Sequence, residues 1–185
     1  MNGGQWTVDG ERGTTVVIRR ATVEDAAAVA ALAEQTFRET FADGNNAADM
    51  DAHCMRAYSP AQQRLEIADP AIDTLVAEVA EGVLAGYAMV RGGGAAAAVQ
   101  GPAPIELWRI YVDRVHHGRG VAQALMTACV EAARARGGLT LWLGVWEQNP
   151  RAQAFYRKLG FVDVGAHVFM LGDDRQTDRV MARAL

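Results

Sequence analysis

Apolar residues in the first half of the chain follow two kinds of spacing. Residues 15–20 (TVVIRR) are rich in β-branched side chains and predict a first strand. After Thr22, a good helix cap with Asp25 in the following turn, apolar residues recur at helical spacing as far as Asp43-Gly44. The pattern predicts three helices, over residues 22–43, 46–58 and 60–68.

In the second half of the chain, predicted strands and helices alternate. Residues 74–80 and 84–90 are mainly apolar on either side of Glu81-Gly82, a turn dipeptide that predicts an antiparallel hairpin. Further strands are predicted over residues 105–112, 139–145, 161–171 and 180–185, and helices over residues 120–136 and 149–160. Because this order mixes hairpins with two crossover helices, we expect an α/β (α+β) fold with a mixed sheet covered by helices.

Two segments fall outside this regular pattern. Residues 1–14 are expected to form a flexible tail before a single domain over residues 15–185, since 185 residues match about one domain. Residues 92–101 (GGGAAAAVQG) are expected to form a long mobile loop between two strands, with a substrate lid as the alternative.

Composition narrows the class of protein. Hydrophobic residues make up 50% of the chain and charged residues 22%, which is typical of a soluble globule and excludes a mainly disordered chain. The 18 basic and 22 acidic residues give a net charge of −4 without a clustered basic face, so we expect no nucleic-acid partner. Cys54 and Cys129 lack disulfide or zinc-ligand spacing, and no apolar run reaches membrane-spanning length. We therefore expect a cytoplasmic protein without a metal or a membrane contact.

A glycine-containing segment, residues 117–122 (HGRGVA), lies between a predicted strand and a predicted helix. The start of a helix presents unpaired backbone N–H groups and the positive end of the helix dipole, which together bind phosphate oxygens. Gly118 and Gly120 would let those amides converge, and His117 and Arg119 would add donors. This placement indicates a phosphate-binding loop.

Three classes of phosphate loop compete for this segment. A nucleoside triphosphate loop is excluded because Val121, and not Lys, follows Gly120. A dinucleotide fingerprint is disfavoured because Gln123 stands where Gly or Ala is required. A pyrophosphate loop for coenzyme A remains, with a tight turn that holds no ligand as the alternative.

A second constellation follows in residues 142–161 (WLGVWEQNPRAQAFYRKLGF). Asn149 suits the N-cap of a helix, Pro150 suits its first turn and Gly160 suits its end. Phe155 and Tyr156 lie within that helix, where they are either core aromatics or groups that approach the same cleft as the glycine loop.

The two motifs together resemble the GNAT family, the Gcn5-related N-acetyltransferases. The family's loop, Gln/Arg-x-x-Gly-x-Gly/Ala, is matched by residues 117–122 except that His stands first. Its later signature is matched by Asn149, Ala152, Phe155, Tyr156, Gly160 and Phe161. Further strings, such as residues 36–41 (TFRETF), 109–112 (RIYV) and 142–147 (WLGVWE), resemble the PaiA-type spermidine/spermine N-acetyltransferases, and so do the residues 170–173 (MLGD) and 176–178 (QTD).

The resemblance implies a GNAT fold in which acetyl-CoA occupies a V-shaped gap between two splayed parallel strands, here residues 105–112 and 139–145. One strand would pair with the pantetheine arm through its backbone, the loop amides would hold the pyrophosphate, and the N-cap asparagine would contact the pantetheine. The implied cofactor-binding residues are Ile110, Tyr111, Val112, His117, Gly118, Arg119, Gly120, Val121, Ala122 and Asn149.

The implied reaction is direct attack of an amine on the thioester. Because an alkyl ammonium has a pKa of about 10.4, either a base removes its proton or the site binds the rare neutral form. Glu106 aligns with the position of the base in some family members, and a solvent-facing strand residue is the alternative. Tyr156 is the expected general acid that protonates the thiolate, with a packed aromatic as the alternative. Glu39 and Glu147 are candidates for the distal ammonium groups of a polyamine, or else ordinary surface carboxylates.

The remaining histidines, His53, His116 and His167, are expected to be structural or exposed. The function expected from the resemblance is acetyl transfer from acetyl-CoA to a primary amine, most simply a polyamine such as spermidine or spermine. One alternative is a protein N-terminal or lysine acetyltransferase, and another is an acyl-CoA-binding regulator without turnover. Expected partners are acetyl-CoA, the small-molecule amine and, as an open option, a second copy of the chain.

Overall fold

The computed structural model describes residues 6–9, 15–41, 45–171 and 174–185 of the chain. The strands are β1 (Trp6–Asp9), β2 (Thr15–Arg20), β3 (Ile72–Ala80), β4 (Val83–Arg91), β5 (Pro104–Val112), β6 (Thr140–Trp146), β7 (Val162–Leu171) and β8 (Asp174–Ala184). The α-helices are α1 (Ala26–Phe41), α2 (Ala47–Ala57), α3 (Pro60–Ala68), α4 (Val121–Ala135) and α5 (Pro150–Lys158). Short 3₁₀ turns, η1 (Val23–Asp25) and η2 (Arg114–His116), precede α1 and α4.

The strands of the described residues form one eight-stranded sheet in the order β1-β2-β3-β4-β5-β6-β8-β7. The pair β5–β6 is parallel, whereas the other neighbouring strands run antiparallel. The expected mixed α/β architecture is therefore confirmed.

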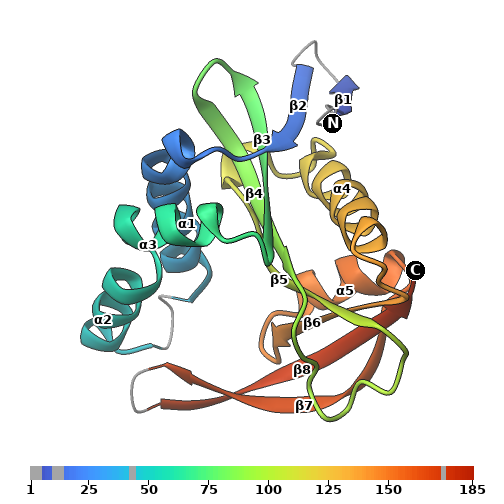
Figure 1. The fold of residues 1–185 in the computed structure, drawn as a ribbon. Helices are drawn as coiled ribbons and strands as arrows, with labels where there is room; N and C mark the ends of the chain where they lie inside the picture. The colour runs from blue at the N-terminus through green and yellow to red at the C-terminus, as the bar shows by residue number, and fades with distance from the viewer. Residues whose placement is uncertain (1–5, 10–14, 42–44, 172–173) are drawn as a thin grey trace.

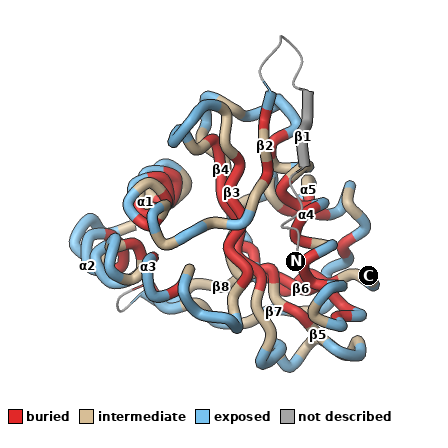
Figure 2. Tube along the Cα trace, turned by 45° about the horizontal axis from the view of Figure 1, so that its top comes forward, coloured by how far each residue is buried: buried red, intermediate tan, exposed pale blue. Residues whose placement is uncertain are grey.

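Helices cover both faces of this sheet (Figure 1). On one face, α1, α2 and α3 bury a core that includes Phe37, Tyr87 and Met89. On the other face, α4 and α5 bury a second core that includes Leu125 and Leu141. The buried residues follow the central strands in Figure 2, so the strands that carry the site are packed on both faces.

Local capping explains where the helices of the first half begin. Thr22 and Asp25 form a capping box around η1, in which the Asp25 carboxylate accepts from the Thr22 backbone N–H at 2.7 Å. The Asn46 side chain caps α2, and Ser59 caps α3 directly before Pro60. These are the positions at which the sequence predicts the helices.

The structure differs from the predictions at two places. Residues 6–9, expected in a tail, form β1 and pair with β2. The helix expected to run to Asp43-Gly44 is described as far as Phe41, and that dipeptide lies outside the described residues, as do residues 1–5 and 10–14 of the expected tail. Strand β8 begins at Asp174 and not at residue 180, because its pairing with β7 continues to Leu171↔Asp174.

Residues 92–101 connect β4 to β5 as the expected long loop, and this loop packs on the sheet. Ala96, Ala98 and Val99 contact a small cluster formed by Trp142, Val180 and Ala182. The loop therefore forms part of the wall around Trp142. Among the described residues, no helix combines the length and the apolarity needed to cross a membrane.

Candidate active site

The parallel strands β5 and β6 part soon after they begin. In the described residues they pair at Pro104↔Thr140, Ile105↔Leu141 and Glu106↔Trp142. Beyond this point β5 follows β4 to Val112, whereas β6 follows β8 to Trp146. The two strands thus border a V-shaped gap whose apex lies at Glu106 and Trp142, as the resemblance implies.

A β-bulge in β5 lies next to this apex. Met89 of β4 pairs with Arg109 and Val90 pairs with Leu107, so Trp108 is left without a partner. The extra residue shifts the alternation of side chains along β5. Leu107, Ile110 and Val112 consequently face the core under α4, while Trp108 and Tyr111 face the core under α1.

The glycine loop lies between the end of β5 and the start of α4. Gly118 and Gly120 have φ values of +75° and +83°, a backbone region that favours glycine. Gly120 is the N-cap of α4, and an added Cβ at either glycine would have no atom within 4 Å. His117 Nε2 lies 2.9 Å from the backbone carbonyl of Val112, a contact that holds the loop against the strand end.

The backbone groups expected to hold a pyrophosphate are accessible at this helix start. His117, Gly118, Arg119 and Gly120 are exposed. Val121, the first residue of α4, buries its side chain in the core, which fixes the direction of the helix. The loop therefore presents the N-terminal amides of α4 to the surface, where they suit an anion.

Helix α5 starts close to the end of β6. The Asn149 side chain caps this helix by accepting from the backbone N–H of Ala152 at 3.0 Å. Gln153, which sequence reasoning missed, is buried and donates to the carbonyls of Trp146 and Glu147. Gln153 thus ties α5 to the strand end that borders the gap.

Tyr156 lies on the buried side of α5. Its ring packs edge-on against Phe155 and Phe161, with centroid separations of 5.5 and 5.8 Å. Tyr156 belongs to the same core cluster as Val145 of β6. Ile110 of β5 also packs against this cluster. Burial raises the pKa of the Tyr156 phenol well above its usual value, so the phenol carries its proton throughout the neutral range.

Beside the apex of the gap, on the face of the sheet opposite to the core that contains Tyr156, lies a cavity of about 520 Å³. It is lined by Arg91, Glu106, Trp142, His167 and residues 92–96 of the loop. Glu106 forms an ion pair with Arg91, whose Nε lies 2.6 Å from Glu106 Oε2. The Arg91 guanidinium in turn stacks on the Trp108 ring, 3.8 Å from its centroid. Glu106 is therefore in this cavity, as a member of an ion pair.

His167 enters the cavity from β7 and lies over Gly144 of β6. A Cβ at position 144 would lie only 3.0 Å from His167 Nε2, so the absence of a side chain makes room for the imidazole ring. The same nitrogen lies 3.6 Å from Asp178 Oδ2 on β8. The Asp178 carboxylate raises the pKa of His167 above its usual value of 6.5. His167 is thus partly exposed, as expected, but its place over Gly144 and beside Asp178 was not expected from the sequence.

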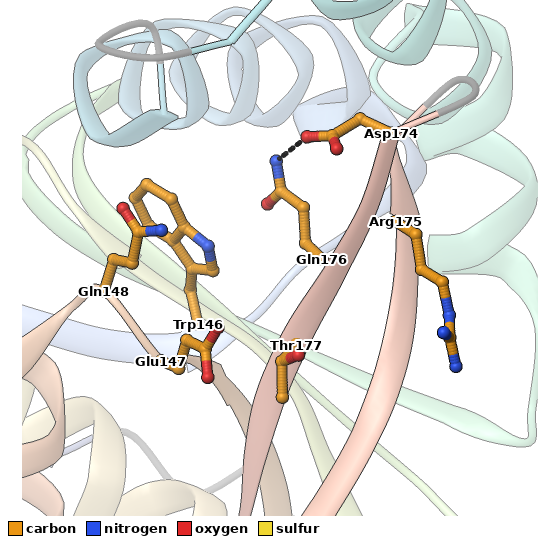
Figure 3. A pocket seen from close by; sticks show the side chains of 7 residues that line it. All are labelled: Trp146, Glu147, Gln148, Asp174, Arg175, Gln176 and Thr177. Atoms are coloured by element: carbon orange, nitrogen blue, oxygen red, sulfur yellow. Dashed lines mark hydrogen bonds between the residues drawn. The ribbon is translucent and has the colours of Figure 1, made fainter.

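A second, smaller cavity of about 180 Å³ lies at the far end of β6. Figure 3 shows its lining residues, among them Trp146, Glu147, Asp174 and Gln176, with the Arg175 side chain directed away from Asp174 and Gln176. Gln176 donates to Asp174 at 2.8 Å. Of the two carboxylates expected to bind the distal ammonium groups of a polyamine, Glu147 therefore lines this cavity.

Glu39 takes a different position. It lies on the exposed side of α1, about 200° around the helix from Phe41, which packs on the core. Its carboxylate accepts from Gln35 at 3.1 Å. The structure does not bring Glu39 together with Glu147 in either described cavity.

One signal in the sequence indicates the face of β6 along which the two cavities lie. Trp142, Gly144 and Trp146 alternate along β6, so period-two spacing puts them on one face of the strand. By contrast, the approach of Arg91 and His167 depends on strand pairings between distant parts of the chain, which sequence spacing does not indicate.

Known proteins share this architecture. The family model described as the acetyltransferase (GNAT) family matches residues 28–161. An uncharacterized N-acetyltransferase in the pepI 3′ region of Lactobacillus delbrueckii subsp. lactis is 33% identical over 172 residues, covering 93% of this chain and 99% of the relative. A [ribosomal protein bS18]-alanine N-acetyltransferase of Haemophilus ducreyi is 40% identical over 55 residues, which are 30% of this chain and 38% of that protein.

Among solved structures, the fold is similar to that of the PaiA N-acetyltransferase from Thermoplasma acidophilum in complex with coenzyme A. The TM-score is 0.73 at 21% sequence identity, over 92% of this chain and 99% of that chain. This likeness establishes the fold, and it is one of several such likenesses among GNAT structures. Because the family model and the Lactobacillus relative each match most of the sequence, the chain belongs to the acetyltransferase (GNAT) family and is an acyl-CoA-dependent N-acetyltransferase.

Proposed function

We propose that this enzyme transfers acetyl from acetyl-CoA to a primary amine of a polyamine such as spermidine or spermine. The observation that carries the proposal is the placement of two cavities along one face of β6. Trp142 lines the larger cavity and Trp146 lines the smaller one. The two tryptophans are four positions apart in the strand, a distance of about 13 Å. A linear amine with two alkyl spacers has a comparable length, so one amine would react in the first cavity while another is held in the second.

The proposed cofactor site lies in the V-shaped gap and at the glycine loop. The backbone of residues 110–112 would pair with the pantetheine amides, since β6 has already separated from β5 there. The amides of residues 118–122 would hold the pyrophosphate, supported by the positive φ values of Gly118 and Gly120. Asn149, at the start of α5, would contact the pantetheine arm through the amide group that is left after capping.

The proposed acid is Tyr156. When the tetrahedral intermediate collapses, the C–S bond breaks and coenzyme A leaves as a thiolate that takes the phenolic proton. Burial keeps this phenol protonated at neutral pH, which is the state that an acid requires. Its packing beside the strands that border the gap supports the role.

The acceptor would enter the larger cavity on the opposite face. Glu106 lies at the apex of the gap and would attract the reacting ammonium, while its pairing with Arg91 keeps the carboxylate in place. The distal ammonium would lie near Glu147 and Asp174, with the Trp146 ring as a cation–π partner. Because Glu39 lies outside both cavities, the proposal assigns the distal ammonium to Glu147 and not to Glu39.

Acetyl-CoA consumption across an acceptor panel tests the proposal. The panel comprises spermidine, spermine, an alkyl monoamine of similar length, a peptide with N-terminal alanine and a peptide with an internal lysine. We expect the polyamines to give the highest kcat/KM. Turnover confined to a peptide would overturn the proposal in favour of a protein acetyltransferase, and acetyl-CoA binding without turnover of any acceptor would indicate a regulator.

A further inference from the structure

We propose that His167, which lies beside Asp178, accepts the proton that the acceptor ammonium must lose before it attacks the thioester. The inference rests on the proposed function, because it concerns the amine that would occupy the larger cavity. It gives the proton-accepting role expected for Glu106 to a residue on a different strand.

His167 lies on the side of the sheet from which the acceptor would approach. His167 lines the same cavity as Glu106 and lies over Gly144, two residues beyond Trp142 along β6. Trp142 forms the last parallel pair with β5, so Gly144 borders the opening of the gap. The imidazole thus lies on the acceptor side of the place where the thioester would lie, across the sheet from the core that contains Tyr156. Acid and base are then on opposite faces, beside the leaving group and the nucleophile respectively.

Glu106 already has a cationic partner. Its carboxylate is in an ion pair with Arg91, and the Glu106 side chain is 15% exposed. The partner of His167 is instead the Asp178 carboxylate, which stabilises the imidazolium that forms when the ring accepts a proton.

Charged groups face His167 from three neighbouring strands. Asp178 on β8 lies 3.6 Å away, and Glu106 on β5 and Arg91 on β4 line the same cavity. Asp178 and, more weakly, Glu106 raise the pKa of His167, whereas burial acts against them. An imidazole that is raised in this way is a stronger base than a free one, and histidine is the side chain that ordinarily exchanges a proton near neutral pH. The His167 side chain is 36% exposed, so the proton can leave to solvent.

In the proposed reaction the acceptor nitrogen loses two of its three protons. The ammonium gives one proton to the His167 imidazole, and the neutral amine forms a C–N bond with the acetyl carbonyl carbon. The intermediate then breaks its C–S bond, and the thiolate takes the proton of the Tyr156 phenol. The second proton on the nitrogen restores the phenol, so one proton is released through His167 for each amide formed.

The pH dependence of kcat/KM for spermidine separates this role from a structural one. In the wild type, kcat/KM should rise through the pKa of His167 and then level off until the amine itself loses its proton, near pH 10. In His167→Gln, only the neutral amine reacts. We therefore expect kcat/KM to fall about 100-fold or more at pH 7.5 and to climb about tenfold per pH unit, approaching the wild type near pH 9.5.

Two further variants sharpen the test. Asp178→Asn removes the carboxylate that stabilises the imidazolium, so the plateau of kcat/KM should begin at a lower pH than in the wild type. Val168→Gln introduces the same side chain at the next position of β7, an exposed residue outside the described lining of both cavities, and should keep the wild-type profile. Thermal unfolding and calorimetry of coenzyme A binding show whether each variant is folded.

A folded His167→Gln enzyme with the wild-type plateau would overturn the inference. So would a Glu106→Gln enzyme that loses the plateau while His167→Gln keeps it, which would assign the base to Glu106. These results differ from failure of the proposed function, in which the wild-type enzyme itself does not acetylate a polyamine.

Discussion

Arg109 of β5 and Glu66 of α3 form a buried ion pair that joins the helical layer to the strand beside the gap. Arg109 Nη1 lies 2.5 Å from Glu66 Oε2, and the two side chains are 9% and 6% exposed. The Arg109 guanidinium also stacks on the Trp108 ring, 3.9 Å from its centroid. The residues that carry this pair are 43 positions apart in the sequence.

The loss of one partner should leave the other charge buried and uncompensated. We expect Glu66→Gln to lower the free energy of unfolding by about 3–5 kcal/mol, measured by urea denaturation. Glu34→Gln is the matched control, because Glu34 pairs with Arg38 on the surface of α1, where such a pair contributes less than about 1 kcal/mol. Equal losses in the two variants would contradict the structural importance of the Arg109–Glu66 pair.

Tyr156→Phe tests the proposed acid. The change keeps the packing of the ring but removes the proton donor, so kcat should fall about ten- to a thousandfold while coenzyme A binding and thermal stability change little. Tyr87→Phe is the control, because Tyr87 is also buried and its hydroxyl has no hydrogen-bond partner among the described residues. A Tyr156→Phe enzyme with the kcat of the wild type, where chemistry limits turnover, would remove Tyr156 from the mechanism.

Gly120→Val tests the proposed pyrophosphate loop. The left-handed backbone at Gly120 disfavours a side chain by about 1–2 kcal/mol, and the added atoms would stand where the phosphate must approach. We expect KM for acetyl-CoA to rise at least tenfold while KM for the amine stays nearly constant. Gly82→Val, at φ +73° in the β3–β4 turn, imposes the same strain in equally open space away from the loop. Unchanged affinity for acetyl-CoA in a folded Gly120→Val variant would refute the loop assignment.

Glu147→Gln tests the site proposed for the distal ammonium. It should raise KM for spermidine several-fold and leave KM for a monoamine unchanged, and added salt should shrink the difference because it screens exposed charges. Glu81→Gln, an exposed carboxylate in the β3–β4 turn, serves as the control. If both acceptors respond equally to Glu147→Gln, the smaller cavity does not distinguish polyamines from monoamines.

His53 should make the stability of the fold depend on pH. Its ring is stacked on Phe37 with 4.6 Å between centroids, and burial lowers the pKa of His53 to about 4. Between pH 6.5 and 4 the unfolded chain therefore binds a proton that the folded chain does not, and stability falls as the pH falls. We expect His53→Gln to reduce this dependence by on the order of 1 kcal/mol per pH unit, measured by urea unfolding at several pH values. An identical slope in both proteins would show that His53 does not titrate in this way.

Local signals predicted most of the elements, because those elements depend on neighbouring residues. The β-branched run of β2, the Thr22 cap and the apolar run of β4 all act within a few positions, and the structure has them where the sequence predicts them. The start of β8 was predicted too late because Asp174 to Arg179 are polar, and their place in the sheet is decided by pairing with β7. The cavity around His167 could not be predicted for the same reason, since it joins residues from β4, β5, β6 and β7.

The bulge at Trp108 changes which sequence positions of β5 face each side of the sheet. Before it, Ile105 and Leu107 point to one side of the sheet at odd positions; after it, Ile110 and Val112 point to that side at even positions. Regular alternation through Trp108, without the bulge, would exchange the sides of every later side chain in the strand. The arginine that holds α3 would then face α4, and apolar side chains would face the helical layer. Because the bulge puts Trp108 and Arg109 on the same side of the sheet, the packing of β5 beside the gap depends on this backbone irregularity as much as on the identity of the side chains.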